Sequence, residues 1–183
     1  MRQRAARVSA GVIVAVIAHL HAIQGEELVP EAVRRALPEA ETFEQRSIVL
    51  TGEQASEFQQ KTGALPPRSP YVLYIGMRGV RAAGFAVVDN VKGKDQLITY
   101  VVTTGTDLRI RAVDIIAYRE AYGGEVRNAS WREQFLGKSP GDPLRPGREI
   151  RIISGATISS RAVTLGVKRV LALLETLKEA LPQ

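Results

Sequence analysis

The chain has 183 residues, of which 45% are hydrophobic and 24% charged, and it contains no cysteine and two histidines. This balance is that of a globular protein, and the length suits one domain with an N-terminal appendage. The absence of cysteine excludes disulfides, thiolate metal sites, c-type haem attachment, iron–sulfur clusters and a lipoprotein anchor. Any redox chemistry would therefore depend on an organic cofactor.

The formal net charge of +6 is concentrated at the N-terminus. Arg2, Arg4 and Arg7 carry three of the charges, which leaves about +3 spread along the rest of the chain. Aromatic residues make up only 5%, and no basic stripe interleaved with aromatics is present, so we expect no nucleic-acid partner. A mildly basic surface beside anionic lipid accounts better for the charge.

Residues 1–25 have the pattern of a Sec-type signal segment. The arginines precede an apolar run over Val8–Ala18 and a polar exit over His19–Glu27. The run is short for the roughly 20 residues of a bilayer span. A cleaved signal and an uncleaved membrane anchor with its positive end in the cytoplasm both fit, and the charged start argues against a buried helix. Either form places the domain in the periplasm or elsewhere outside the cytoplasm.

Residues 26–70 are predicted to form an N-terminal helical extension. The apolar pattern of residues 28–37 indicates a short helix ended by Pro38, and Ser47–Leu50 is a short apolar run typical of a strand. Thr51 and Gln54 have the spacing of a capping box for a helix that extends to about Lys61. Residues 63–70 form a loop rich in proline.

Residues 71–183 are predicted to form an α+β domain, in which helices pack on an antiparallel sheet. Four stretches are rich in β-branched and aromatic residues and are separated by short turns: Tyr71–Ile75, Gly84–Val88, Gln96–Val102 and Ile110–Tyr118. A helix is expected from about Ser159 to Leu181, because apolar residues recur there at steps of three and four. These are Val163, Val167, Val170, Leu174, Leu177 and Leu181.

The segment Ile152–Ser160 joins a predicted strand to this last helix. Ser154, Gly155 and Ala156 are small, so a bulky group could approach the backbone there. The free amide groups and the dipole of a helix start favour a phosphate, and the Thr157 hydroxyl is placed to be esterified by one. The plain alternative is a turn in which Thr157 or Ser159 caps the helix and nothing binds.

The sequence Ser154-Gly-Ala-Thr-Ile-Ser-Ser160 resembles the flavinylation motif of the FMN-binding domain family. That family includes the G subunit of Rnf electron-transport complexes and the C subunit of the sodium-pumping NADH:quinone oxidoreductase. The resemblance implies an FMN joined through a phosphoester to Thr157, installed outside the cytoplasm by a flavin transferase that uses FAD. It also implies a flavin site at the strand–turn–helix joint, with Ser159 and Ser160 at the motif's trailing positions.

The resemblance extends upstream to Tyr118–Lys138, which is similar to the family's segment of a Glu, a glycine turn, an aromatic residue and a Gln-Phe-x-Gly-Lys run. Glu120, Tyr122 and Gly123 are expected to border the flavin ring, against the alternative of a surface turn. Trp131 and Phe135 are four residues apart on a predicted short helix and are expected in the core. The predicted cofactor site therefore comprises Ser154, Gly155, Ala156, Thr157, Ser159, Ser160, Glu120, Tyr122 and Gly123.

One position departs from the family. Members usually carry an Asp three residues before the motif's serine, and this chain has Arg151 there. Glu149 lies two residues away, on the same face if the segment is a strand, and could substitute for that acid. Arg127 and Arg151 are candidates for stabilising reduced flavin.

The resemblance implies an exported electron-transfer flavoprotein that relays electrons between membrane or periplasmic redox partners. No general acid–base pair for substrate turnover is evident, so we expect a carrier and not a free-standing enzyme. Two alternatives remain: a noncovalent FMN-dependent reductase of a small acceptor, and a flavin-free binding or sensory module of the same fold.

Overall fold

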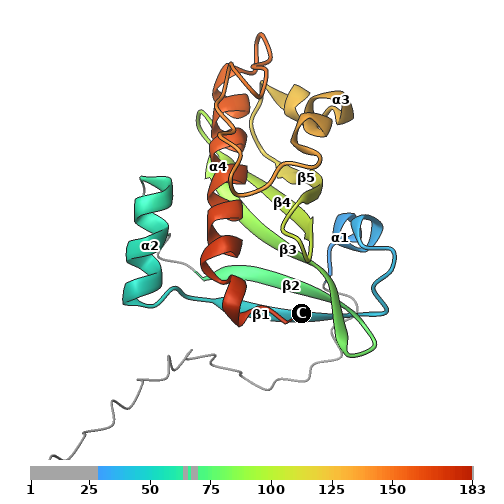
Figure 1. Ribbon diagram of the computed structural model, residues 1–183. Coiled ribbons are helices and arrows are strands. Elements are labelled where there is room, and N and C mark those ends of the chain that lie inside the picture. The colour runs from blue at the N-terminus through green and yellow to red at the C-terminus, as the bar shows by residue number, and fades with distance from the viewer. Residues whose placement is uncertain (1–28, 64–65, 67–69, 183) are drawn as a thin grey trace, which may run out of the picture.

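The computed structural model describes residues 29–63, 66 and 70–182, and its centre is a five-stranded antiparallel sheet (Figure 1). The strands lie in chain order, each paired with the next, so the sheet is a simple meander. The predicted α+β class with an antiparallel sheet is confirmed. The strands are β1 (Thr42–Ile48), β2 (Tyr71–Arg78), β3 (Arg81–Lys92), β4 (Leu97–Gly105) and β5 (Ile110–Tyr118).

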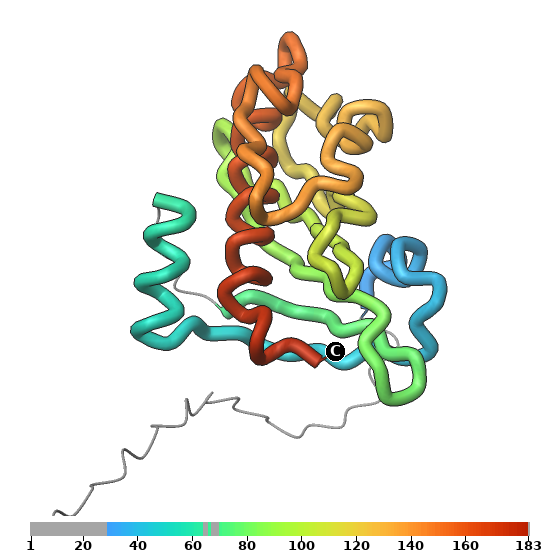
Figure 2. The backbone as a smooth tube through the Cα atoms, viewed as in Figure 1, coloured from blue at the N-terminus to red at the C-terminus, as the bar shows by residue number. Residues whose placement is uncertain are grey.

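Helices cover both faces of the sheet. The long helix α4 (Thr157–Thr176) packs on one face, with α2 (Gly52–Thr62) beside it, and the short α1 (Glu31–Ala36) packs on the other (Figure 1). The segment between β5 and α4, yellow to orange in Figure 2, contains η2 (Gly124–Arg127), α3 (Ala129–Arg132) and η3 (Glu133–Phe135). The short turn η4 (Lys178–Ala180) follows α4.

The main core lies between α4 and the sheet. The inward side chains of the helix recur at three and four residues, as the sequence predicted, and include Val163, Val167, Val170 and Leu174. Gly166 allows this close approach, because a Cβ there would collide with the Tyr100 ring. Trp131 and Phe135 are buried in the same core, with their rings 5.3 Å apart edge to face, as expected.

The predicted strands all exist, and Ile110–Tyr118 has the bounds expected of it. β2 and β3 are longer than predicted, because their hairpin continues outward to Arg78 and Arg81 at the turn. Arg78 and Arg81 are exposed, and Met77, Ala82 and Ala83 are partly exposed, so this end of the hairpin has little of the apolar alternation by which a strand is recognised.

The stretch predicted as a helical extension also supplies a strand of the sheet. β1 pairs with β2 along its whole length, from Thr42↔Met77 to Ile48↔Tyr71. The strand begins five residues before the expected Ser47 and ends at Ile48. Its first residues were not predicted because Glu44 and Arg46, which form an ion pair of 2.8 Å, interrupt the apolar pattern, as is common on an edge strand.

The helix after it forms as expected. The Thr51 amide donates to Gln54 Oε1 at 3.0 Å, which is the return bond of the predicted capping box. The predicted signal or anchor over residues 1–25 lies outside the described residues. Among those that are described, no helix is both long and apolar enough to cross a membrane.

Candidate functional site

The strand predicted before α4 does not form, because residues 151–153 have no regular secondary structure and only Ile150 makes an isolated bridge. A tight turn joins this segment to the helix and leaves most of its small residues at the surface. Gly155 has a φ of +81°, a left-handed conformation that favours glycine, and nothing lies within 4 Å of the position its Cβ would take. Ser154, Gly155 and Thr157 are exposed, whereas Ala156 is buried. A bulky group therefore has open access to this backbone.

The helix begins at Thr157, two residues before the predicted start. Ala156 is the N-cap and has no side chain able to cap, so the alternative in which Thr157 or Ser159 caps the helix is wrong. The first bond of the helix runs from the Ser160 amide to the Ala156 carbonyl at 2.8 Å. The amides of residues 157–159 have no partner among the described residues, and neither does the exposed Thr157 hydroxyl.

Ser160 closes the turn from inside. Its hydroxyl donates to the Ala156 carbonyl at 2.8 Å and accepts from the Ile153 amide at 3.2 Å, and its side chain is fully buried. The structure therefore gives Ser160 the role of bracing the turn that presents Thr157.

Ser159 also points inward, where it meets the end of β5. Its hydroxyl lies 3.0 Å from Tyr118 Oη, and Tyr118 in turn donates to the Tyr122 carbonyl at 2.5 Å. Since the phenol has one proton, Ser159 is the donor in the first bond. The Arg127 guanidinium lies 5.5 Å from the centre of the Tyr118 ring. Tyr118 thus contacts Ser159, Tyr122 and Arg127 at once. The sequence did not single it out, although it is the last residue of a predicted strand and the first of the family-like segment.

Gly123 is pressed against the start of α4. A Cβ on this residue would lie 2.9 Å from Tyr118 Oη, 3.0 Å from Ser159 Oγ and 3.5 Å from Ala156 Cα, and its φ is +83°. The turn therefore needs a glycine both for its conformation and for the close approach. The neighbouring Tyr122 side chain is 87% exposed. Of the predicted upstream residues, the structure brings these two to the motif.

Glu120 is engaged elsewhere. Its carboxylate accepts from the amides of Asp95 and Gln96, at 2.8 and 2.9 Å, and so holds the β3–β4 turn. These backbone donors, that of Gln96 first, lower the pKa of the Glu120 carboxyl. Gly93 leaves room for the carboxylate.

The segment before the motif is clamped by α3 and η3. The Trp131 indole donates to the Arg151 carbonyl at 2.7 Å, and the Arg151 amide donates to Gln134 Oε1 at 2.9 Å. Both backbone groups of Arg151 are fixed, and its exposed side chain has only a long bond of 3.4 Å to the same Gln134 oxygen. We call Trp131, Gln134 and the Arg151 backbone the motif clamp.

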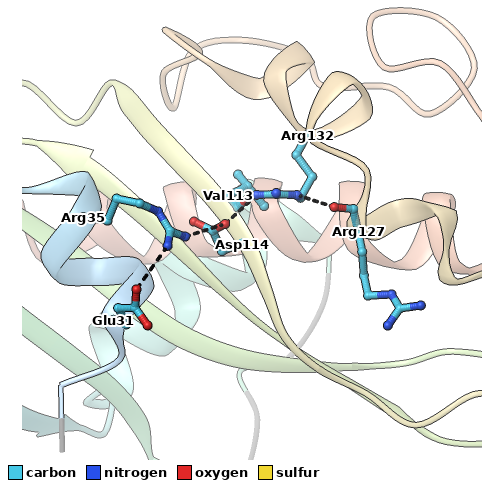
Figure 3. Close-up of polar contacts among 6 residues, drawn as sticks. All are labelled: Glu31, Arg35, Val113, Asp114, Arg127 and Arg132. Carbon is cyan, nitrogen blue, oxygen red and sulfur yellow. Dashed lines mark hydrogen bonds and ion pairs between the residues drawn. The ribbon is translucent and has the colours of Figure 1, made fainter. Parts of the chain in front are cut away.

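The clamp is itself anchored to the sheet through Arg132, as Figure 3 shows. This guanidinium donates to the Val113 carbonyl at 2.6 Å and to Asp114 at 2.5 Å, and its Nε donates to the Arg127 carbonyl at 3.1 Å. Asp114 also pairs with Arg35 of α1 at 3.5 Å. α3 is thereby tied to β5 and to the opposite face of the sheet.

Glu149 is not available to replace the missing acid. Its carboxylate accepts from the Arg145 side chain at 2.7 Å and from the Arg145 amide at 2.9 Å. These bonds, the side-chain one first, lower the pKa of Glu149 to about 2. Arg151 and Arg161 have no ion pair within the described part of the chain, so the exposed charge flanking Thr157 is positive. No cluster of metal-ligating side chains occurs among the residues that the structure describes.

The chain is similar to known proteins in part of its sequence and in its fold. Residues 93–172 match the FMN-binding domain family. The chain is 27% identical over 161 residues to the G subunit of the Na⁺-translocating ferredoxin:NAD⁺ oxidoreductase complex of Acetobacterium woodii, a match that covers 81% of this chain and 74% of that protein. Its fold is similar to that of NqrC from Shewanella oneidensis, with a TM-score of 0.51 and 17% identity over 81% of this chain and 72% of that one.

Proposed function

Since residues 93–172 belong to the FMN-binding domain family, we propose that the chain carries one FMN as a phosphoester on Thr157 and transfers electrons outside the cytoplasm. The supporting observation is the exposed, unpartnered Thr157 hydroxyl at an uncapped helix start. In this proposal Ser154, Gly155 and Ala156 admit the phosphate, and Ser159 and Ser160 hold the turn from inside.

The residues present suit a phosphate. Three successive backbone amides without partners, together with the positive end of a 20-residue helix, favour an anion beside residue 157. The left-handed Gly155 keeps side-chain atoms away from that position. The arginines flanking the motif add positive potential.

Attachment is a transfer of the FMN half of FAD. The Thr157 oxygen forms a bond to the FMN-side phosphorus, the pyrophosphate bond to AMP breaks, AMP leaves, and the threonine proton is released to a base. A dedicated flavin transferase is the partner that this step requires. The described chain offers no carboxylate at the threonine to act as that base, which agrees with a reaction carried out by another protein.

Bound flavin supplies reversible one- and two-electron chemistry, and this chain's residues position it. The Tyr118–Ser159 bond and the packing of Gly123 fix the turn next to the acceptor, and the Tyr122 side chain projects freely beside it. The relative in Acetobacterium woodii is named as a subunit of a ferredoxin:NAD⁺ oxidoreductase complex. By analogy we assign the partners of this chain to membrane or periplasmic redox proteins.

Intact mass of protein made together with a flavin transferase tests the proposal. The parent should gain one FMN less water and should fluoresce in a denaturing gel, and Thr157→Ala should lose both while it remains folded. Thr106→Ala is the matched control, because Thr106 is also exposed and lies in the β4–β5 turn. Flavin that is released on denaturation would instead support the noncovalent reductase, and protein without flavin would support the binding or sensory module.

A further inference from the structure

An exposed stripe runs down α4 from the acceptor residue. Thr157, Ile158, Arg161 and Leu165 are all exposed, at the three- and four-residue spacing of one helix face. Ile158 is 50% exposed and Leu165 is 56% exposed, whereas most of the neighbouring helix residues are buried against the sheet. Two large apolar side chains therefore face outward on the same side as the proposed attachment point.

The described residues leave Ile158, Arg161 and Leu165 in this half of α4 exposed. α2 lies beside the C-terminal half of the helix (Figure 1), where Lys61 bridges to Glu175 at 2.9 Å. The other elements that pack on α4 in the described part of the chain include β3, β4 and η2. Ile158 and Leu165 are therefore accessible to a group tethered at Thr157.

Arg161 lies at the centre of the stripe, one turn after Thr157. Its side chain has no hydrogen bond or ion pair with any residue that the structure describes. Helix side chains lean toward the N-terminus, so a residue at position 161 reaches back over the turn that carries residue 157. An anion that precedes a cation by four residues is the favourable order on a helix.

We infer that Arg161 binds the phosphate of the cofactor attached at Thr157, and that Ile158 and Leu165 form the seat of its ring system. This inference rests on the proposed function and names the residues that hold the tethered group. A phosphodiester at Thr157 supplies the anion that Arg161 lacks, and a flat, largely apolar ring tethered there covers the two aliphatic side chains. The occupant is the cofactor, and not a second copy of the chain or a partner protein.

The first experiment needs no flavin. Thr157→Glu places a carboxylate at the attachment position, and its acid dissociation is followed by NMR with and without Arg161→Gln. Arg161 should raise the acid dissociation constant about twofold, as expected of a helical pair at this spacing. Lys178→Gln, which removes a positive charge beyond the other end of α4, should leave the constant unchanged. Equal constants with and without Arg161 would overturn the assignment of Arg161.

The second experiment uses the flavin-loaded protein. Time-resolved fluorescence anisotropy should show an approximately twofold larger mobile fraction of the ring in Arg161→Gln and in Leu165→Ser, and no change in Lys178→Gln. An unchanged mobile fraction, or sedimentation that shows a dimer lost in Leu165→Ser, would overturn the seat. If the parent carries no flavin, the proposed function fails, and the carboxylate titration still decides whether Arg161 reaches an anion at position 157.

Discussion

Three of the motif's four hydroxyl residues lie in the first four positions of α4, and the helix gives each a different environment. Thr157 faces outward. Relative to it, Ser159 lies about half a turn and Ser160 most of a turn further around the helix, and both are buried. Ser160 braces the turn and Ser159 binds Tyr118, so only Thr157 keeps a free, accessible oxygen. Burial alone thus separates the residue available for modification from the two that support it.

Arg151 should control the rate of flavin attachment. Its backbone is fixed by the motif clamp, so its exposed side chain is presented at a constant place to an approaching transferase. We expect Arg151→Asp to accelerate modification by a transferase from a related system, because the acid restores the charge found in related proteins. The same change should lower the flavin's reduction potential slightly, since a cation near reduced flavin is lost. Timed mass spectrometry and redox titration measure the two effects.

Arg148→Asp is the matched control for this prediction. Arg148 is exposed, its side chain has no ion pair in the described part of the chain, and it precedes the motif clamp. It should change neither the rate nor the potential by as much as Arg151→Asp. Slower modification together with an unchanged potential in Arg151→Asp would show that Arg151 is an ordinary surface residue.

At the scale of elements, the motif depends on α3 and η3, which are short and have no intrinsic stability as helices. They are held by the buried pair Trp131 and Phe135 and by the bonds of Arg132 to β5. Through the motif clamp they fix the segment that leads into the Thr157 turn. The site is therefore assembled by side chains that reach across the fold.

Gln134→Ala should loosen this joint. It removes the acceptor of the Arg151 amide, which should cost about 1 kcal/mol of unfolding free energy and slow flavin attachment to Thr157. Gln134→Glu is the control for the acceptor, because it retains an oxygen for the Arg151 amide and, like Gln134→Ala, loses the bond that Gln134 Nε2 donates to the Trp131 carbonyl at 2.9 Å. Chemical denaturation and timed mass spectrometry measure the two variants. Attachment at the parental rate in Gln134→Ala would exclude a role for the clamp in presenting the motif.

The long-range parts of the site were the ones that the sequence did not predict. Apolar periodicity located α4 and the strands, because burial against a sheet imposes a regular spacing. It placed the start of α4 at about Ser159, shortly before the first apolar residue of the pattern, whereas the helix starts at Thr157 after an alanine. The hydrogen bond between Trp131 and Arg151 joins residues 20 positions apart, and the one between Ser159 and Tyr118 joins residues 41 positions apart. No local sequence pattern predicts such bonds.

At the scale of the whole molecule, the sheet is a meander to which residues 42–48 add the first strand. The predicted boundary at residue 70 therefore falls between two paired strands. Only the end of β1 was predicted, as Ser47–Leu50, because the rest of this edge strand carries charged residues and few apolar side chains. α1, by contrast, is short but fills the second face with Val33 and Leu37.

Export of the whole domain is a further prediction, based on the arginine-rich start and the apolar run over Val8–Ala18. An alkaline phosphatase fused to the C-terminus should be active in cells, since that enzyme folds only outside the cytoplasm. Replacement of Arg2, Arg4 and Arg7 by glutamate should reduce the activity by weakening the orientation signal. A stable but inactive fusion to the parent chain would contradict the export.

The stability of the whole domain should fall in alkali because of tyrosines buried between α4 and the sheet. Burial, followed by the nearby Asp89 carboxylate, raises the pKa of Tyr71, and burial also raises that of Tyr100. A tyrosine whose pKa is raised in the folded state stabilises the fold fully at pH values below its unfolded-state pKa of about 10. This stabilisation is lost as the pH rises above that value. Tyr71 Oη has no hydrogen-bond partner in the described residues, whereas Tyr100 donates to Asp89 at 2.7 Å.

Tyr71→Phe should therefore flatten the alkaline loss of stability while keeping the ring that packs near Phe58. At neutral pH the variant should be as stable as the parent or up to about 1 kcal/mol more stable, because an unsatisfied buried hydroxyl is removed. Urea denaturation between pH 7 and 11 measures both effects. Tyr122→Phe, at an exposed position, should follow the parent at every pH. If Tyr71→Phe loses stability above pH 10 as steeply as the parent, the buried Tyr71 hydroxyl does not contribute to the alkaline transition, which would then depend on other groups such as Tyr100 and Tyr74, whose pKa values burial also raises.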